Sequence, residues 1–194
     1  MDVLRRFRET NALLDGHFVL SSGLHSPKYL QCALALQNPQ DASFYGAEIV
    51  GELTKQGLAE NVECVASPAI GGLIIGFAVA QALGVRFIWT ERQDGEMTLR
   101  RGFTLRDGEP VLVVEDVITT GGSTRECIAA LEANGANVVA AASIIDRSNG
   151  SANVGVPRVA LVSLDVPSYE ATVCPLCEAG TVAIKPGSRS EQPA

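Results

Sequence analysis

Residues 110–126 read Pro-Val-Leu-Val-Val-Glu-Asp-Val-Ile-Thr-Thr-Gly-Gly-Ser-Thr-Arg-Glu, and this stretch decides the fold. Its first part, 111–114, is an aliphatic run of strand length in which no polar residues alternate. Such a run is typical of a strand that is buried on both faces, as in a parallel sheet. Ser123 followed by Glu126 matches a capping box, so we expect a helix to begin at Ser123. The stretch therefore predicts the strand, loop and helix of an α/β fold.

The loop between this strand and helix predicts an anion site beside a hydroxyl-binding site. Gly121 and Gly122 allow close backbone approach, and a helix N-terminus favours a phosphate through its free N–H groups and its dipole. Hydroxyl donors are available at Thr119, Thr120, Ser123 and Thr124. Glu115 and Asp116 would repel a phosphate, so they are better suited to accept hydrogen bonds from sugar hydroxyls. A phosphorylated ribose satisfies both halves; the alternative is a βα turn whose acids are merely solvated.

The whole stretch resembles the phosphoribosyl-diphosphate (PRPP) binding signature of type I phosphoribosyltransferases. That signature has four hydrophobic residues, two acids (the first is Glu here), two further residues and a Thr/Gly-rich loop. The resemblance implies a catalytic role for Asp116 and PRPP binding by Glu115, Asp116, Val117, Ile118, Thr119, Thr120, Gly121, Gly122 and Ser123. It also implies Mg²⁺ as cofactor, held mainly through substrate oxygens and water rather than by protein ligands. Neither G-x-x-x-x-G-K-[ST] nor G-x-G-x-x-G after a strand occurs, which disfavours a nucleotide triphosphatase or a Rossmann dehydrogenase.

Residues 17–32 predict two short strands around a Ser22-Gly23 turn. Beside the PRPP motif they resemble the N-terminal hood of orotate phosphoribosyltransferases, which covers the pyrimidine. The matching residues are Phe18, Leu20, Ser22, Gly23, Ser26 and Pro27. Ser21 stands where members often carry a lysine, and Tyr29-Leu30 replaces an aromatic pair. The resemblance implies that Tyr29 and Thr119 contact orotate.

Two further strand ends carry predicted site residues. A predicted buried strand over 137–145 is followed by Asp146 and Arg147. The resemblance places the carboxylate of orotate against Arg147, whose planar guanidinium matches a carboxylate bidentately; the alternative is a surface arginine paired with Asp146. After a predicted strand over 62–65, the resemblance implies that Ile70 and Gly71 meet the pyrophosphate of PRPP through their backbone. The alternative there is a plain strand-to-helix turn.

Residues 91–106 are polar and contain arginines at 92, 100, 101 and 106, without an apolar period of useful length. We therefore expect a long mobile loop or a hairpin. In orotate phosphoribosyltransferases a basic loop here closes over the diphosphate, often from the neighbouring subunit. The usual R-K-x-x-K-x-H-G run is absent, and Arg92 is the only cation near the start of the loop. The resemblance implies a catalytic role for Arg92 and a homodimer whose 91–106 loop reaches the neighbouring active site.

Strands and helices alternate along the chain. Helices are predicted over 2–14, 39–57, 73–83 and 123–134, and further strands over 85–90 and 159–164. We expect one phosphoribosyltransferase domain over 1–194 with a type I phosphoribosyltransferase fold. A small N-terminal hood (about 1–37) precedes a core (about 38–165) with a central parallel sheet flanked by helices, and a C-terminal segment and tail follow (166–194).

Composition excludes several classes of protein. A net charge of −7 argues against nucleic acid as a partner, because nucleic-acid binding rests on neutralising phosphates. The uncharged stretch 64–85 is long enough to span a membrane, but Pro68 and paired glycines interrupt it, so we expect no membrane partner. The five cysteines are an odd number in hydrophobic contexts, and the N-terminus has no apolar leader; both favour a reduced, cytoplasmic location.

Cys174-Pro-Leu-Cys177 raises the question of zinc. A single pair supplies two of the four ligands that a structural zinc site needs. His17 and His25 are the only histidines and are distant in sequence. We therefore expect packed free thiols, with zinc as the less favoured alternative.

The reaction that the resemblance implies is transfer of the 5-phosphoribosyl group from PRPP to orotate. The products are orotidine 5′-monophosphate and pyrophosphate, a step of pyrimidine (UMP) biosynthesis. One alternative is a purine phosphoribosyltransferase, against which the hood sequence and Arg147 argue. The other is a PRPP-sensing regulator without transfer chemistry, which the weakened 91–106 loop keeps open.

Overall fold

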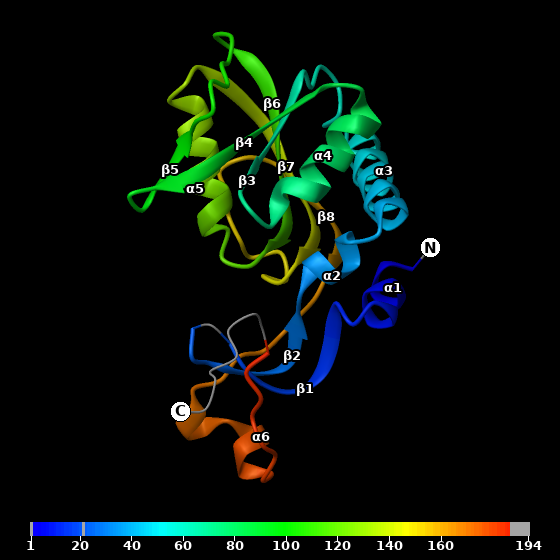
Figure 1. Cartoon of the computed structure of the whole chain (residues 1–194), viewed down its shortest axis with the longest axis vertical. Coiled ribbons are helices and arrows are strands. Elements are labelled where there is room, and N and C mark those ends of the chain that lie inside the picture. Colours follow the sequence, from blue (N-terminus) through cyan, green and yellow to red (C-terminus); the bar gives the residue numbers. More distant parts are fainter. Residues whose placement is uncertain (1, 21, 187–194) are drawn as a thin grey trace.

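The computed structural model describes residues 2–20 and 22–186 (Figure 1), so Ser21 and most of the predicted polar tail lie outside it. The elements up to the first strand of the core are α1 (Val3–Glu9), β1 (Leu13–Val19), β2 (His25–Leu30), α2 (Cys32–Leu36), α3 (Pro39–Lys55) and β3 (Cys64–Pro68). They are followed by α4 (Gly72–Leu83), β4 (Arg86–Gln93), β5 (Glu96–Leu99), β6 (Glu109–Ile118) and α5 (Gly122–Glu132). The last elements are β7 (Ala136–Asp146), β8 (Arg158–Ser163), a 3₁₀ turn (Ala171–Val173) and α6 (Pro175–Glu178).

The central sheet has six strands in the order β5-β4-β3-β6-β7-β8. Every neighbouring pair is parallel except β4 and β5. Helices α3 and α4 cover one face of this sheet and α5 covers the other (Figure 1). The predicted fold, a mostly parallel sheet flanked by helices, is thereby confirmed.

Strand β6 is buried on both faces, as its aliphatic run predicted. Leu112 and Val114 belong to the core beneath α3 and α4, whereas Val111 and Val113 belong to the core beneath α5. All four side chains are completely buried. Because successive side chains of a strand point to opposite faces, one run of four aliphatic residues supplies both cores.

Helices α3 and α4 pack so closely that a glycine is required between them. A Cβ atom on Gly46 of α3 would lie 2.7 Å from the backbone of Ala78 in α4. The helices carry the large buried side chains Tyr45, Ile49 and Leu53 on α3 and Ile75 on α4. Helix α4 is apolar but short, and no helix within the described residues is long and apolar enough to cross a membrane.

The N-terminal hood is a two-stranded antiparallel sheet of β1 and β2, below the core in Figure 1. The helix predicted over 2–14 was too long: it ends at Glu9, and Asp15 with Gly16 belongs to β1 instead of closing a helix. Asn11, with a φ of 56°, turns the chain, and Leu13 then pairs with Leu30. Pairing between strands thus overrode a local helical pattern.

The C-terminal segment returns to the hood after β8. Its residues Tyr169 and Ile184 form isolated bridges to His25 of β2 and Phe18 of β1. Backbone hydrogen bonds of 2.8 Å join each of these pairs of segments. The hood in the folded chain therefore consists of N-terminal strands together with residues near the C-terminus.

Candidate active site

The loops that follow β3 and β6 lie at the point where the sheet changes direction. From β3 the chain continues to β4 on one side, and it later returns to place β6 on the other side of β3. In open α/β sheets such a switch point, at the carboxyl ends of the strands, is where ligands bind. Residues 69–71 and 119–121, both predicted from the sequence to meet PRPP, are the loops at this point.

The motif loop forms a small polar cavity of about 230 Å³. Its lining consists of Arg92, Glu115, Val117, Ile118, Thr119, Thr120, Gly121, Gly122, Ser123, Thr124 and Glu126. Gly121, with a φ of 75°, is the N-cap of α5, and no side chain caps this helix end. The predicted capping box was therefore wrong, because α5 begins at Gly122 and Glu126 forms an ion pair with Arg92. The first N–H groups of α5 remain available to an anion.

Arg125 fixes the shape of this loop, a role that sequence reasoning missed. Its Nη1 donates to the carbonyl oxygens of Thr120 and Asn153, each at 2.8 Å. A Cβ atom on Gly121 would lie 2.8 Å from Val154 Cγ1, whereas one on Gly122 would meet only Thr120 Oγ1 at 3.6 Å. The loop is thus held against the segment between β7 and β8, and only Gly121 is required by the protein itself.

Glu115 and Asp116 lie where β6 ends, and burial affects both. Desolvation, with a smaller contribution from the Asp116 charge, raises the pKa of Glu115 to about 8. Desolvation also raises the pKa of Asp116, although its carboxylate accepts a hydrogen bond from the Val117 N–H at 2.8 Å. Within the described part of the chain, no arginine or lysine forms an ion pair with either acid. Two buried carboxyl groups without a cationic partner among the described residues suit a ligand that brings hydroxyls or a cation.

The loop after β3 touches the same carboxyl groups. A Cβ atom on Gly71 would lie 2.8 Å from Asp116 Oδ1, and one on Gly72 would lie 3.2 Å from Glu115 Oε2. The peptide bond between Ala69 and Ile70 is cis, and the Ile70 side chain is 84% exposed. The two loops predicted to bind PRPP are therefore in direct contact, and glycines make this contact possible.

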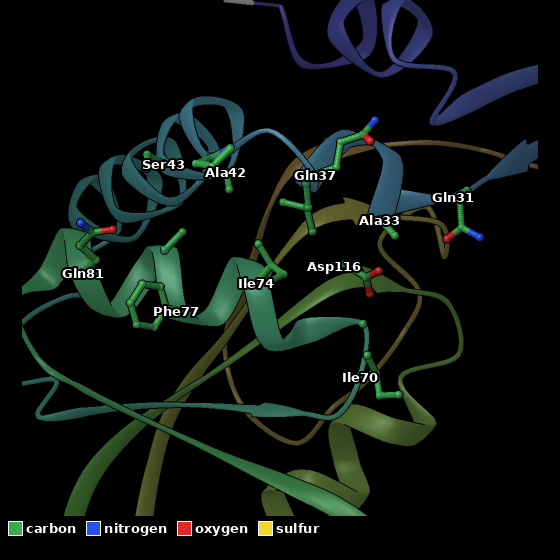
Figure 2. A pocket seen from close by; sticks show the side chains of 14 residues that line it. Gln31, Ala33, Gln37, Ala42, Ser43, Ile70, Ile74, Phe77, Gln81 and Asp116 are labelled. Carbon is green, nitrogen blue, oxygen red and sulfur yellow. The ribbon is translucent and has the colours of Figure 1, made fainter.

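An apolar groove leads away from Asp116 between α2, α3 and α4 (Figure 2). Its volume is about 660 Å³. The side chains of Ile74 and Phe77 on α4 line it and are 53% and 60% exposed, and Ile70 lies at its end next to Asp116. The groove meets the site at Asp116 and the loop after β3, and its other lining residues belong to α2, α3 and α4 or lie next to the ends of α2.

A second cavity at the site, of about 580 Å³, lies between the hood and the motif loop. The hood supplies an apolar wall that includes Val19, Leu20, Leu24, Tyr29 and Leu30. Thr119, Thr120 and Arg147 form the opposite side. The ring of Phe18 lies 5.8 Å from that of Tyr29 and supports it from the hood. The structure thus brings together Tyr29, Thr119 and Arg147, the residues predicted to contact orotate.

Arg147 is half-buried beside this cavity. Its Nε atom is buried and has no hydrogen-bond partner among the described residues, and desolvation lowers the pKa of this side chain. The alternative that it pairs with Asp146 was wrong, because Asp146 Oδ2 instead forms an ion pair of 2.9 Å with Arg158. Burial alone would raise the pKa of Asp146, but hydrogen bonds from Ser148 and Arg158 outweigh it and lower the pKa. A half-buried cation beside a cavity, with its neighbouring acid paired to another arginine, is suited to an anionic ligand.

The 91–106 region is a β4–β5 hairpin, one of the two predicted forms. Arg92 lines the small polar cavity of the motif loop and donates to the carbonyl of Gly95 at 2.7 Å, besides its ion pair with Glu126. Arg101 pairs with Glu91 at 2.8 Å. Of the predicted cations in this region, Arg92 is therefore the one placed at the motif loop of its own chain.

Sequence reasoning missed Lys185 and Ser168, which line the cavity between hood and motif loop. Both belong to the C-terminal segment, and Lys185 follows Ile184, which pairs with Phe18. This pairing joins residues that are far apart in sequence and leaves no local pattern. Lys185 adds a second cation to the cavity that holds Arg147.

Comparisons with known proteins identify the family of this chain. The family model described as "Phosphoribosyl transferase domain" matches residues 38–159. The chain is 50% identical over 189 residues to the orotate phosphoribosyltransferase of Acidithiobacillus ferrooxidans, covering 97% of this chain and 96% of that protein. It is also 50% identical over 181 residues to that of Thermotoga maritima, covering 93% and 95%.

Solved structures give the same result for the fold. The crystal structure of orotate phosphoribosyltransferase from Aeropyrum pernix superposes with a TM-score of 0.69 at 27% identity, covering 92% of this chain and 98% of that one. An adenine phosphoribosyltransferase superposes with a TM-score of 0.62 at 18% identity and shows a shared fold alone. Since the fold is common to both classes, the sequence relationships over nearly the whole length decide: this chain belongs to the orotate phosphoribosyltransferase family.

Proposed function

We propose that this protein transfers the 5-phosphoribosyl group of PRPP to orotate, forming orotidine 5′-monophosphate and pyrophosphate in pyrimidine biosynthesis. The observation that carries the proposal is the half-buried guanidinium of Arg147, whose buried Nε has no hydrogen-bond partner in the described part of the chain, in a cavity that also reaches Thr119 and Thr120 of the motif loop. A flat, apolar base with one carboxylate would satisfy both the apolar hood wall and this cation. The relatives' names support the same substrate.

The site residues act by holding and orienting substrates rather than by forming a covalent intermediate. We assign the 5′-phosphate to the loop from Thr119 to Ser123, where the N-terminus of α5 provides free N–H groups. Glu115 and Asp116 would accept hydrogen bonds from the ribose hydroxyls. Gly71, which touches Asp116, and Ile70 would present their backbone to the pyrophosphate.

In the reaction, the bond between C1′ and the pyrophosphate oxygen breaks, and its electron pair leaves with the pyrophosphate. The pyrimidine nitrogen N1 of orotate forms the new bond to C1′, and its proton passes to the departing pyrophosphate or to water. Tyr29 from the hood and Arg147 from the opposite wall of the cavity would hold N1 in line with C1′. Alignment of this kind and stabilisation of the departing charge carry most of the rate in such transfers. Arg92, at the edge of the small polar cavity of the motif loop, is the cation placed to meet that charge.

The acids are also suited to Mg²⁺. Carboxylate oxygens are ligands that Mg²⁺ accepts, and Glu115 and Asp116 have no basic partner among the described residues. Bound there through the ribose and diphosphate oxygens and through water, the ion would supply positive charge to the pyrophosphate leaving group. Most ligands of the ion would then be substrate and water oxygens, and Asp116 and Glu115 would contact it mainly through these.

We further propose a homodimer in which the 91–106 hairpin reaches the neighbouring active site. The exposed apolar side chains Ile70, Ile74 and Phe77 next to Asp116 support a subunit contact beside the site. The hairpin also carries Arg100 and Arg101, of which Arg101 pairs with Glu91 within this chain. The five free cysteines support a reducing, cytoplasmic setting.

A base-selection assay distinguishes the proposal from its two rivals. Purified protein with PRPP and Mg²⁺ should form nucleotide from orotate and not from uracil, adenine or hypoxanthine. Formation of AMP or IMP would instead identify a purine enzyme, and tight PRPP binding with no product from any base would identify a regulator.

The PRPP site can be tested separately with Asp116→Asn. Asn keeps the shape of the side chain but loses the charge-assisted hydrogen bond to the ribose, worth about 1.5–3 kcal/mol, so the Kd for PRPP should rise by about 10- to 150-fold. The circular-dichroism spectrum should not change. Calorimetry that gave the parent Kd for this variant would remove Asp116 from the site.

A further inference from the structure

Four metal-ligating side chains meet in the hood, away from the proposed active site. They are His17 on β1, His25 on β2, and Cys174 and Cys177 in the C-terminal segment. One ligand atom from each lies within 4.8 Å of all the others. Residues separated by as many as 160 positions are therefore gathered at one point, which the sequence alone did not indicate.

The distances between these atoms match a tetrahedral site. Zinc bonds of about 2.3 Å to sulfur and about 2.0–2.1 Å to nitrogen place the sulfur and nitrogen ligands about 3.6 Å apart. Cys174 Sγ lies 3.6 Å from His17 Nε2, Cys177 Sγ lies 3.8 Å from the same atom, and Cys177 Sγ lies 3.3 Å from His25 Nδ1. The two ring nitrogens, at 2.8 Å, would separate by roughly half an ångström on metal binding.

Hydrogen bonds on the side of the His17 ring away from the cluster orient this side chain for metal binding. Its Nδ1 lies 3.1 Å from the carbonyl oxygen of Thr181 and 2.9 Å from the Thr181 hydroxyl. Because a carbonyl only accepts, Nδ1 carries the proton and the lone pair of Nε2 points into the cluster. A backbone carbonyl on the second nitrogen is the usual way in which proteins fix a metal-binding histidine.

We propose that His17, His25, Cys174 and Cys177 form a structural zinc site. Two thiolates and two imidazoles are the ligand set of closed, four-coordinate zinc sites, and hard cations such as Mg²⁺ prefer oxygen. Three of the four side chains are buried, so the set leaves no open position for a substrate. The two thiols lose their protons on binding, and the two thiolate charges balance that of Zn²⁺.

The site compensates for a weak apolar core. Of the described residues from 165 to 186, only Val166 and Cys174 are buried, while Val173, Val182 and Ile184 are at least 60% exposed. A two-stranded sheet is marginal by itself, and small units of this kind use metals as staples. The zinc would lock the C-terminal segment to β1 and β2, which also places Lys185 and Tyr29 around the hood cavity.

Metal analysis of the full-length protein, purified without a histidine tag or added metal, tests the site independently of catalysis. We expect about one zinc per chain. The exposed ligand Cys177 offers a mild variant, Cys177→Ser, which should lose most of the zinc, whereas Cys127→Ala, outside the cluster, should keep it. Replacement of zinc by Co²⁺ should give the visible bands of a tetrahedral cobalt–thiolate site in the wild-type protein. This measurement decides the question even if variants fold poorly.

Three results would overturn the proposal. These are wild-type protein without bound zinc and without cobalt–thiolate bands, zinc retained equally by Cys177→Ser, or a disulfide between Cys174 and Cys177 in the native protein. A further readout concerns the role of the site. Removal of zinc with a chelator should speed amide exchange over 13–30 and 166–186 by about tenfold or more and leave 111–114 unchanged. Unchanged exchange in the hood would contradict a stapling role.

Discussion

At the scale of single residues, burial of adjacent acids makes the stability of the protein depend on pH. The pKa of Glu115 is raised to about 8 from 4.5, so the folded state binds a proton that the unfolded state has released between these values. Stability is therefore unaffected by this group below about pH 4.5, falls as pH rises, and is lowest above about pH 8. The substrate site thus carries a stability cost at neutral pH.

Glu115→Gln removes that cost and should become more stabilising as pH rises. Relative to the parent, its free energy of unfolding should increase by about 3 kcal/mol between pH 5 and pH 8, since each pKa unit corresponds to about 1.4 kcal/mol. Urea unfolding at several pH values measures this difference. Glu132→Gln, on the exposed face of α5, serves as the control and should not alter the pH dependence. A constant difference for Glu115→Gln would show that Glu115 is ionised throughout.

The two motif glycines should differ when each is replaced by alanine. Gly121 has a φ of 75° and a Cβ there would meet Val154 at 2.8 Å, so Gly121→Ala should destabilise the fold by about 1–2 kcal/mol and weaken PRPP binding. Gly122 has open space, so Gly122→Ala should leave stability within about 0.5 kcal/mol. Thermal unfolding and PRPP calorimetry distinguish them. Equal destabilisation by both would show that the loop has another shape.

The sequence could predict the motif residues because their spacing is local: strand, acids and Gly-containing loop follow one another directly. Lys185 could not be predicted, because its position depends on the pairing of Ile184 with Phe18. The capping box failed for a similar reason, since Glu126 pairs with Arg92 from a distant hairpin. A short sequence pattern cannot predict site residues whose positions depend on contacts between segments that are distant in the chain.

At the scale of elements, hydrophobic periodicity identified α3, α4 and α5 and the parallel strands to within a few residues. It failed for α1, where Leu13 and Leu14 continue a helical stripe in sequence but belong to strand β1. Leu13 is buried in the core, and pairing of both residues with β2 decides their conformation. Hydrophobic periodicity therefore predicts an element well within its length. It predicts less well where one element ends and the next begins, as between α1 and β1.

The close packing of α3 on α4 gives a stability prediction. Gly46→Ala places a Cβ atom 2.7 Å from the Ala78 backbone, which cannot move without shifting α4, so we expect a loss of about 1–3 kcal/mol. Gly51→Ala in the same helix meets no atom within 4 Å and should stabilise by about 0.5–1 kcal/mol. Urea midpoints measure both changes. Stabilisation by Gly46→Ala would show that the helices are further apart than described.

At the scale of the whole molecule, the site is assembled from a core that the sequence predicts well and a hood that it predicts in part. The buried run of β6 and the acids after it indicate a parallel sheet with ligands at its carboxyl edge. The return of the C-terminal segment to the hood, and with it the cluster of His17, His25, Cys174 and Cys177, follows from tertiary structure alone. The cavity that should accept the base lies between these two parts.

Recognition of the orotate carboxylate by Arg147 can be measured through steady-state pyrophosphate release with Arg147→Met. Met keeps much of the side-chain stem and removes the charged fork, a loss of about 2–3 kcal/mol or more. The kcat/KM for orotate should fall by about 10²-fold or more, while the Kd for PRPP stays within about twofold of the parent value. Loss of orotate turnover and PRPP binding together would make Arg147 structural, and an unchanged kcat/KM for orotate would contradict the account.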